Sequence, residues 1–170
     1  WSSDVCSSDM AIPGTANLEH RIGGIEKEDL TGNVSYDPDN HHYMVETRAK
    51  KVESVANEFK PTEVFGESSG NVLILSWGGT KGACRSATES LQADGQKVSQ
   101  VHLRWINPLP KDLGEILIKF KHVLIPEINF GQLIKIIRSE YLVDAKGLNL
   151  VRGKPISSSN IQESVKALIG

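Results

Sequence analysis

The chain has 170 residues, of which 39% are hydrophobic and 24% are charged, and its formal net charge is −2. This composition is typical of a folded domain with an apolar core and argues against a disordered chain. The apolar runs are far shorter than the roughly 18 residues of a membrane-spanning helix, and no block of basic residues indicates binding to nucleic acid.

The first nine residues, WSSDVCSSD, are rich in serine and aspartate and have neither a helical nor a strand period. A widely used sequencing-library adapter gives the same string when translated, so we interpret residues 1–9 as an artefact joined to the protein. The alternative is a natural N-terminal tail without regular structure. Without this segment one cysteine is left, Cys84, so the sequence predicts no disulfide framework and suits a cytoplasmic protein.

Residues 10–40 are rich in glycine, aspartate and asparagine and show no sustained hydrophobic period. Loops of this length are uncommon inside compact domains, so we predict an extended linker arm that lies on another domain or subunit. A globular domain is predicted over residues 41–170. It begins with a helix that Pro61 ends and that carries one apolar stripe, formed by Val45, Ala49, Val52, Ala56 and Phe59.

Strands alternate with helices in the rest of the chain, which predicts a doubly wound α/β fold. The predicted strands cover residues 63–66, 72–75, 97–105, 122–126 and 148–151. Four helices are predicted between and after these strands, and their inward positions are Ala83, Ala87 and Leu91; Leu113, Ile116, Leu117 and Phe120; Leu133, Ile136, Ile137 and Tyr141; and Ile161, Val165 and Leu168. Gly95 is predicted to end the first of these helices, and a capping box of Ser159 and Gln162 to begin the last. Ligand and partner contacts are expected at the carboxyl ends of the strands.

The first candidate site is the stretch GNVLILSWGGTKGA at residues 70–83, where a buried strand ends at Trp77 and a helix follows. Gly78 and Gly79 permit a tight turn, and Thr80 is a candidate cap for the helix. Such a turn presents backbone N–H groups, which bind either an anion or a polar loop of another chain. Because the spacing matches no established phosphate-binding motif, docking on protein is favoured over anion binding.

The second candidate site is the strand-to-helix junction at residues 127–132, on the same predicted edge of the sheet. Its polar and turn-forming residues are Glu127, Asn129, Gly131 and Gln132, which we predict bind polar groups of a neighbour. The alternative is ordinary turn formation and helix capping. We therefore predict that an edge formed by residues 77–80 and 127–132 faces a partner domain, with Trp77 as its anchor.

Three other groups were weighed as chemical sites. Cys84 lies early in a predicted helix, where the helix dipole activates a thiol, but its alanine neighbours favour a small buried residue. The acids and histidines between Asp37 and His42 have no recognised metal-binding spacing. No serine or cysteine partner is placed by the sequence beside any histidine, so no catalytic residue and no metal site are predicted.

Nearly all of residues 12–156 resembles the C-terminal part of the α subunit of 2-oxoacid:ferredoxin oxidoreductases of the 2-oxoglutarate type. Several stretches carry this resemblance together, although none of them is specific alone: LEHRIGG at 18–24, GNVSYDPDNHHYMVETRAKK at 32–51, SWGGTKGA at 76–83, NPLP at 107–110, PEINFGQL at 126–133 and YLVDAKGLNLVRGKP at 141–155.

The resemblance implies a fold similar to the transketolase C-terminal domain. That fold is α/β, with three α/β/α layers and a five-stranded mixed, mostly parallel sheet whose first strand is antiparallel. Residues 63–66 are the candidate for the antiparallel strand, and the extended arm precedes the domain.

The resemblance also implies a complex that converts 2-oxoglutarate, coenzyme A and oxidised ferredoxin to succinyl-CoA, CO2 and reduced ferredoxin, using thiamine diphosphate and iron–sulfur clusters. In the family, the preceding domain of the α subunit and the β subunit hold the thiamine ring. The family's activating glutamate and substrate-binding residues have no position here, so we predict a non-catalytic packing domain that binds no cofactor itself. The alternative is a free-standing α/β module that binds a small phosphorylated ligand at Gly78 and Gly79.

Overall fold

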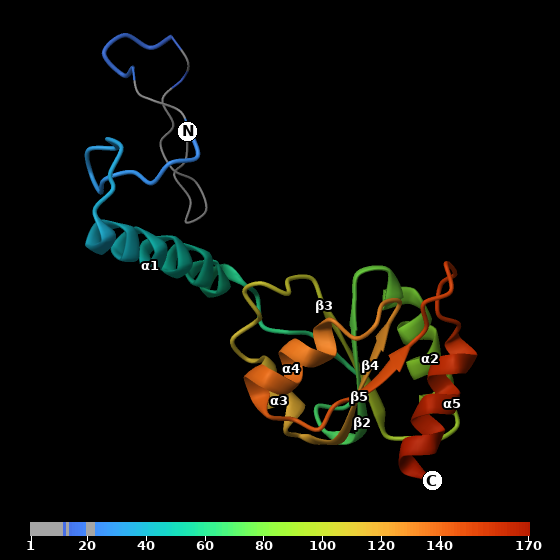
Figure 1. Ribbon diagram of the computed structural model, residues 1–170. Helices are drawn as coiled ribbons and strands as arrows, with labels where there is room; N and C mark the ends of the chain where they lie inside the picture. Colours follow the sequence, from blue (N-terminus) through green and yellow to red (C-terminus); the bar gives the residue numbers. More distant parts are fainter. Residues whose placement is uncertain (1–11, 13, 20–22) are drawn as a thin grey trace. The chain divides into compact units, whose positions relative to one another are not determined.

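The computed structural model describes residue 12, residues 14–19 and residues 23–170 (Figure 1). The chain divides into two compact units, Trp1–Phe59 and Lys60–Gly170. The sequence prediction placed a boundary before residue 41, whereas this division assigns the first helix to the N-terminal unit. The segment interpreted as an artefact, residues 1–9, lies outside the described residues.

The N-terminal unit contains helix α1, Pro38–Ser54, and a 3-10 turn, Val55–Glu58. Asp37 caps α1, because its carboxylate accepts hydrogen bonds from the backbone N–H groups of Asp39 and Asn40 at 2.7 and 3.0 Å. The predicted helix is therefore confirmed with an earlier start. The part of its apolar stripe within α1 is exposed, since Val45 and Val52 are each 45% exposed and no residue of α1 is buried, whereas Ala56 of the stripe is buried in the 3-10 turn.

The second unit is built on a five-stranded mixed sheet in the order β1-β3-β2-β4-β5. The strands are β1 Val64–Phe65, β2 Gly70–Trp77, β3 Val98–Leu103, β4 Phe120–Glu127 and β5 Lys146–Asn149. Strand β1 pairs antiparallel with β3, and all other pairs are parallel. The predicted sheet and its antiparallel first strand are thereby confirmed.

Helices cover both faces of this sheet and complete the three predicted layers (Figure 1). Helices α2, Lys81–Ala93, and α5, Ser158–Ile169, pack on one apolar cluster, and α3, Leu113–Leu117, and α4, Leu133–Tyr141, pack on the other. Successive side chains of a strand point to opposite faces, so Val72 and Ile74 join the first cluster while Leu73 and Leu75 join the second. All four side chains are fully buried, as their unbroken apolar run predicts.

Pairing and packing shift three predicted positions. Trp105 lies beyond the end of β3 and is 55% exposed rather than inward. Phe120, predicted on a helix, begins β4 because it pairs with Gly70 at the start of β2. On α4, Ile134 turns into the core in place of Ile136, which is 43% exposed.

The last strand and helix also begin earlier than predicted. Strand β5 starts at Lys146, where it pairs with Leu124 of β4. Helix α5 starts after Ser157, whose hydroxyl oxygen accepts a hydrogen bond from the backbone N–H of Asn160 at 3.2 Å. The predicted cap, Ser159, lies inside the helix, so the capping box of Ser159 and Gln162 is not formed.

We expect Ser157→Ala to lower the free energy of unfolding by about 1 kcal/mol, because the first turn of α5 loses its side-chain acceptor. Ser159→Ala is the matched control and should change stability by less than about 0.5 kcal/mol. Urea denaturation of both variants measures the difference. Equal losses for the two serines would contradict the assignment of Ser157 as the cap.

Candidate partner interface at the carboxyl edge of the sheet

Strands β2 and β4 are parallel neighbours, with Ile74 opposite Leu124. At their carboxyl ends the chain leaves β2 for α2 on one face of the sheet and leaves β4 for α4 on the other face. Adjacent strands whose connections diverge in this way form a topological switch point, where doubly wound sheets place their sites. The fold therefore brings the two predicted junctions, residues 77–80 and 127–132, to neighbouring strands.

The glycine turn after β2 is a 3-10 turn, Gly78–Thr80, with Gly78 in the left-handed region at φ +53. An added Cβ at Gly78 or Gly79 would meet no atom within 4 Å, so the turn is open on its outer side. The Thr80 hydroxyl donates to the backbone oxygen of Trp77 at 2.8 Å and accepts from its N–H at 3.3 Å. Thr80 thus closes the turn and does not cap α2 with its side chain, contrary to the prediction.

The Trp77 side chain is half-buried and packs against the apolar cluster under α3 and α4. Its indole is therefore part of the domain's own packing as well as part of the edge. Replacing Trp77 would disturb the fold and the edge together, which makes it a poor probe of the predicted interface.

The second junction uses its polar side chains internally. Glu127 is fully buried, and its two carboxylate oxygens accept hydrogen bonds from the backbone N–H groups of Leu133 and Ile134 at 2.9 and 3.2 Å. This places a negative charge at the start of α4, where the helix dipole stabilises it. The capping role that the sequence left as an alternative is the one that Glu127 has in the structure.

Asn129 shapes the turn that follows. Its side-chain oxygen accepts hydrogen bonds from the N–H groups of Gly131 and Gln132 at 2.8 and 3.0 Å. Gly131 has φ +85, and a Cβ there would lie 2.9 Å from Ile134, so both conformation and space require glycine. Of the four residues predicted at this junction, Gln132 alone is exposed.

Apolar side chains that the sequence reasoning did not single out lie exposed after the parallel strands. Phe130 is 86% exposed and Ile128 is 52% exposed after β4, and Trp105 and Val151 follow β3 and β5 with exposures of 55% and 49%. The signal that could have found them is the alternation of Ile128 and Phe130 with polar residues in a turn, where apolar side chains have no core to enter. Exposed apolar groups gathered on one side mark interaction surfaces.

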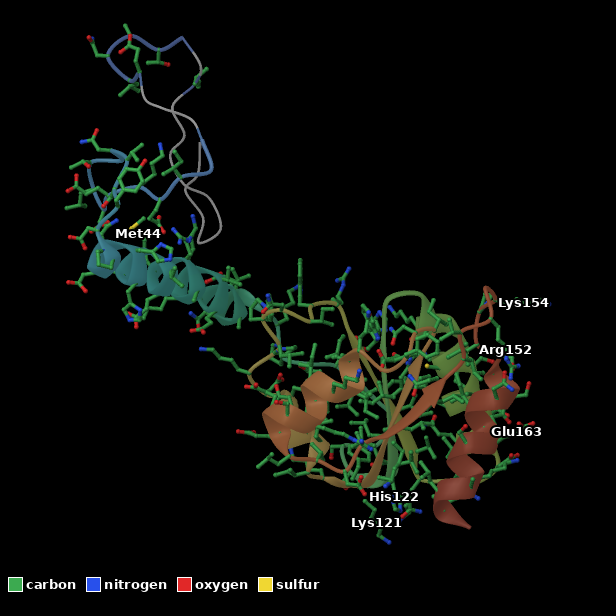
Figure 2. All side chains as sticks on the ribbon, viewed as in Figure 1. Met44, Lys121, His122, Arg152, Lys154 and Glu163 are labelled. Carbon is green, nitrogen blue, oxygen red and sulfur yellow. The ribbon has the colours of Figure 1, made fainter. Side chains whose placement is uncertain are left out.

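Cations accompany these apolar residues. Lys81, Arg104, Arg152 and Lys154 are exposed and follow the ends of β2, β3 and β5, and none forms an ion pair with any residue that the structure describes. Figure 2 shows Arg152 and Lys154 at the end of the sheet opposite Lys121 and His122. The carboxyl edge therefore carries exposed apolar side chains together with positive charge.

A buried polar cluster lies beneath the glycine turn. The Ser76 hydroxyl is fully buried, donates to the backbone oxygen of Val101 at 3.1 Å and accepts from the Gln100 amide at 3.0 Å. His102 Nδ1 lies 3.0 Å from the same hydroxyl oxygen. Burial lowers the pKa of His102, and the positive charges of Lys81 and Arg104 lower it further. The sequence analysis did not predict this contact. It joins the ends of β2 and β3, and the buried serine oxygen is not accessible to a substrate.

The other chemical candidates have structural roles. Cys84 is fully buried, and burial raises the pKa of its thiol to about 12, so the reactive-thiol alternative is wrong. Among the described residues no three histidine, cysteine or acidic side chains gather as a metal site. Asp37 caps α1 and His41 contacts Glu26 instead. No described helix has both the length and the apolar character needed to cross a membrane.

Two curated relatives match almost the whole chain. It is 36% identical over 161 residues to 2-oxoglutarate oxidoreductase subunit KorA of Mycobacterium tuberculosis, covering 94% of this chain and 24% of that protein. It is 30% identical over 169 residues to the 2-oxoacid:ferredoxin oxidoreductase subunit alpha of Saccharolobus solfataricus, covering 95% of this chain and 26% of that protein. The chain spans about a quarter of the length of these relatives. No family model matches it.

Two solved structures are also similar to the chain. A 2-oxoglutarate:ferredoxin oxidoreductase from Magnetococcus marinus, with 2-oxoglutarate, coenzyme A and succinyl-CoA bound, matches with a TM-score of 0.88 and 35% identity, over 99% of this chain and 30% of that one. A split-gene transketolase in an inactive β4 tetramer matches 65% of this chain with a TM-score of 0.52 and 19% identity, which shows the fold alone.

We expect Glu127→Gln to destabilise the sheet domain by about 1–3 kcal/mol, because the new amide group turns a donor toward the N–H groups at the start of α4. Gln132→Ala, in the same junction but with an exposed side chain, should stay within about 0.5 kcal/mol of the parent. Urea denaturation measures both. A Glu127→Gln variant as stable as the parent would show that the carboxylate does not support α4.

We expect Cys84 to resist iodoacetamide at pH 8 in the folded chain and to react once the chain is unfolded in urea. The reason is that a thiol whose pKa is raised to about 12 is almost wholly protonated at pH 8 and is also buried. Mass spectrometry of the peptide that contains Cys84 measures the label separately from Cys6. Rapid labelling of the folded chain would overturn this assignment.

Proposed function

We propose that this chain, a member of the 2-oxoacid:ferredoxin oxidoreductase α-subunit family that corresponds to its C-terminal region, is a non-catalytic packing and assembly domain. Its relatives are named for the oxidation of 2-oxoglutarate or other 2-oxoacids. The reaction that we propose for the whole complex converts 2-oxoglutarate, coenzyme A and oxidised ferredoxin to succinyl-CoA, CO2 and reduced ferredoxin. Identities of 36% and 35% to two proteins named for 2-oxoglutarate support this substrate.

The partners proposed for this chain are the preceding thiamine-binding domain of the α subunit and the β subunit, with ferredoxin as the electron acceptor of the complex. Thiamine diphosphate, coenzyme A and the iron–sulfur clusters are then held by those other parts. The internal use of Glu127, Asn129 and Thr80 supports this division, because the polar groups of the edge already have structural roles. We place the complex in the cytoplasm, which suits a chain with a free thiol at Cys84.

The observation that carries the packing role is the exposure of apolar side chains, Phe130 above all, at the carboxyl edge. Aromatic side chains at the centre of an interface contribute most of the binding free energy, and surrounding charges mainly fix orientation. Phe130, with 86% of its surface exposed, is therefore a better anchor than the half-buried Trp77. Lys81, Arg104, Arg152 and Lys154 supply the charged surroundings of the same edge.

The second candidate function is the binding of a small phosphorylated ligand at Gly78 and Gly79. The observation that favours it is a pair of cations near the open turn, Lys81 and Arg104, whose positive charges both lower the pKa of His102. Calorimetry with pyrophosphate separates the two functions. A packing domain gives no saturable heat, whereas a phosphate-binding module does.

We expect Phe130→Ala to weaken association of the full α subunit with its β subunit by at least about tenfold, which corresponds to about 1.4 kcal/mol. Ile118→Ala is the matched control, because Ile118 is 75% exposed and precedes β4 at the opposite end of the strand. Both variants should keep the melting temperature of the parent. Association is measured by calorimetry, and turnover is measured by reduction of ferredoxin.

Two outcomes would contradict this proposal. If Phe130→Ala leaves both association and turnover unchanged, the carboxyl edge faces solvent in the complex. If Phe130→Ala and Ile118→Ala weaken association equally, the loss reflects surface apolarity in general and assigns no role to this edge.

A further inference from the structure

Residues 26–35 of the predicted arm form a hairpin, called here the arm hairpin. An antiparallel bridge joins Lys27 to Val34, and the backbone N–H of Ser35 donates to the oxygen of Glu26 at 3.0 Å. Nearer the tip, the N–H of Glu28 donates to the oxygen of Asn33 at 2.7 Å. This part of the arm is thus a formed turn with its own backbone hydrogen bonds.

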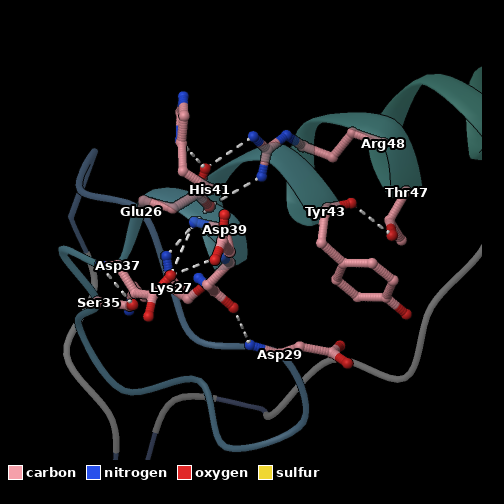
Figure 3. A network of polar contacts seen from close by, with 11 residues as sticks. Glu26, Lys27, Asp29, Ser35, Asp37, Asp39, His41, Tyr43, Thr47 and Arg48 are labelled. Carbon is pink, nitrogen blue, oxygen red and sulfur yellow. Dashed lines mark hydrogen bonds and ion pairs between the residues drawn. The ribbon is translucent and has the colours of Figure 1, made fainter.

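A partly buried carboxylate, that of Glu26, fixes the arm hairpin to α1, as Figure 3 shows. The two terminal nitrogens of Arg48 donate to the two carboxylate oxygens of Glu26 at 3.0 and 2.9 Å, and His41 Nδ1 lies 2.7 Å from one of them. The Glu26 side chain is only 15% exposed. The hydrogen bonds from Arg48 are the largest cause of a Glu26 pKa lowered to about 2. Bidentate pairing with arginine fixes geometry as well as adding binding energy.

A second attachment comes from Asn40 in the first turn of α1. Its amide nitrogen donates to the backbone oxygen of Lys27 at 2.9 Å, and its amide oxygen accepts from the N–H of Asp29 at 3.0 Å. The hairpin is therefore held at its base by Glu26 and along one strand by Asn40. Both attachments are polar, and no described residue before Val55 is buried. The contacts that fix the hairpin to α1 in the described part of this unit are therefore polar rather than apolar.

The arm hairpin displays a leucine at its tip. Leu30 is 99% exposed and has φ +66, in the left-handed region that is unfavourable for a leucine. Gly32 and Thr31 complete the turn through backbone hydrogen bonds to Glu28 and Asp29. A conformation that is unfavourable for leucine, in a turn fixed by two polar attachments, is explained if the side chain is buried by another molecule.

The charges beside Leu30 indicate the chemistry of that other molecule. Glu28 and Asp29 immediately precede Leu30, and the exposed carboxylate of Asp39 lies in the first turn of α1. A surface that buries the leucine must also accommodate these carboxylates, and lysine or arginine at the rim of an apolar pocket does so.

We propose that the arm hairpin is a docking element that inserts Leu30 into an apolar pocket with a basic rim on a partner domain outside this chain. This rests on the proposed function, since it needs a larger assembly. The match to transketolase covers 65% of the chain, whereas the match to the 2-oxoglutarate:ferredoxin oxidoreductase covers 99%.

The test replaces Leu30 in the full α subunit assembled with its β subunit. Asparagine tolerates the left-handed conformation, so Leu30→Asn removes the apolar side chain without straining the turn. The matched control is Leu142→Asn, because Leu142 is 90% exposed with φ +53 and ends α4 in the other unit. We expect the first variant to weaken assembly at least tenfold and the second to leave it unchanged, with equal melting temperatures.

A photo-crosslinking residue at position 30 identifies the pocket. We expect crosslinks in the assembled complex to one peptide outside this sequence, rich in aliphatic residues and flanked by lysine or arginine. Crosslinks to residues 60–170, or none, would overturn the proposal, as would equal effects of Leu30→Asn and Leu142→Asn. If Phe130→Ala leaves association unchanged while Leu30→Asn weakens it, the carboxyl-edge interface fails and the docking element stands; the reverse result refutes the docking element alone.

Discussion

Strand β2 is the constraint on which the sheet domain depends, because its apolar side chains need cover on both faces. Val72 and Ile74 on one face and Leu73 and Leu75 on the other are all fully buried. Cover on both faces requires connections that leave neighbouring strands in opposite directions. The same requirement produces the switch point between β2 and β4 at the carboxyl edge.

At the carboxyl edge, polar side chains are used inside the domain, whereas apolar side chains are exposed. Glu127, Asn129 and Thr80 have the polar groups that a binding site needs, yet each satisfies backbone groups at a turn or helix start. Phe130 and Trp105 would be expected in a core, yet they are exposed. Polar groups near strand ends are needed internally because every turn leaves backbone donors unpaired. The groups at this edge that are available to contact a partner are therefore mainly the exposed apolar side chains.

The two units of the chain are stabilised by different forces. The sheet domain has two apolar clusters, one on each face of the sheet, whose burial supplies most of its stability. The N-terminal unit has charged and amide contacts instead, with Glu26 between Arg48 and His41 and Asn40 along the hairpin backbone. Contacts of this kind fix a shape but contribute little net stability. A unit built in this way is suited to being completed by another surface.

The sequence by itself determined the features that depend on local pattern. The apolar run at residues 72–75 predicted the central strand, Gly95 with φ +77 ends α2 where predicted, and the family motifs predicted the sheet and its antiparallel first strand. The tertiary structure decided what depends on distant partners. Phe120 lies in a strand because Gly70 is opposite, and Glu127 is a cap because the start of α4 folds back over it. Phe130 and Leu30 are exposed because no described element of their own unit covers them, and the residue type alone does not predict the exposure of a side chain.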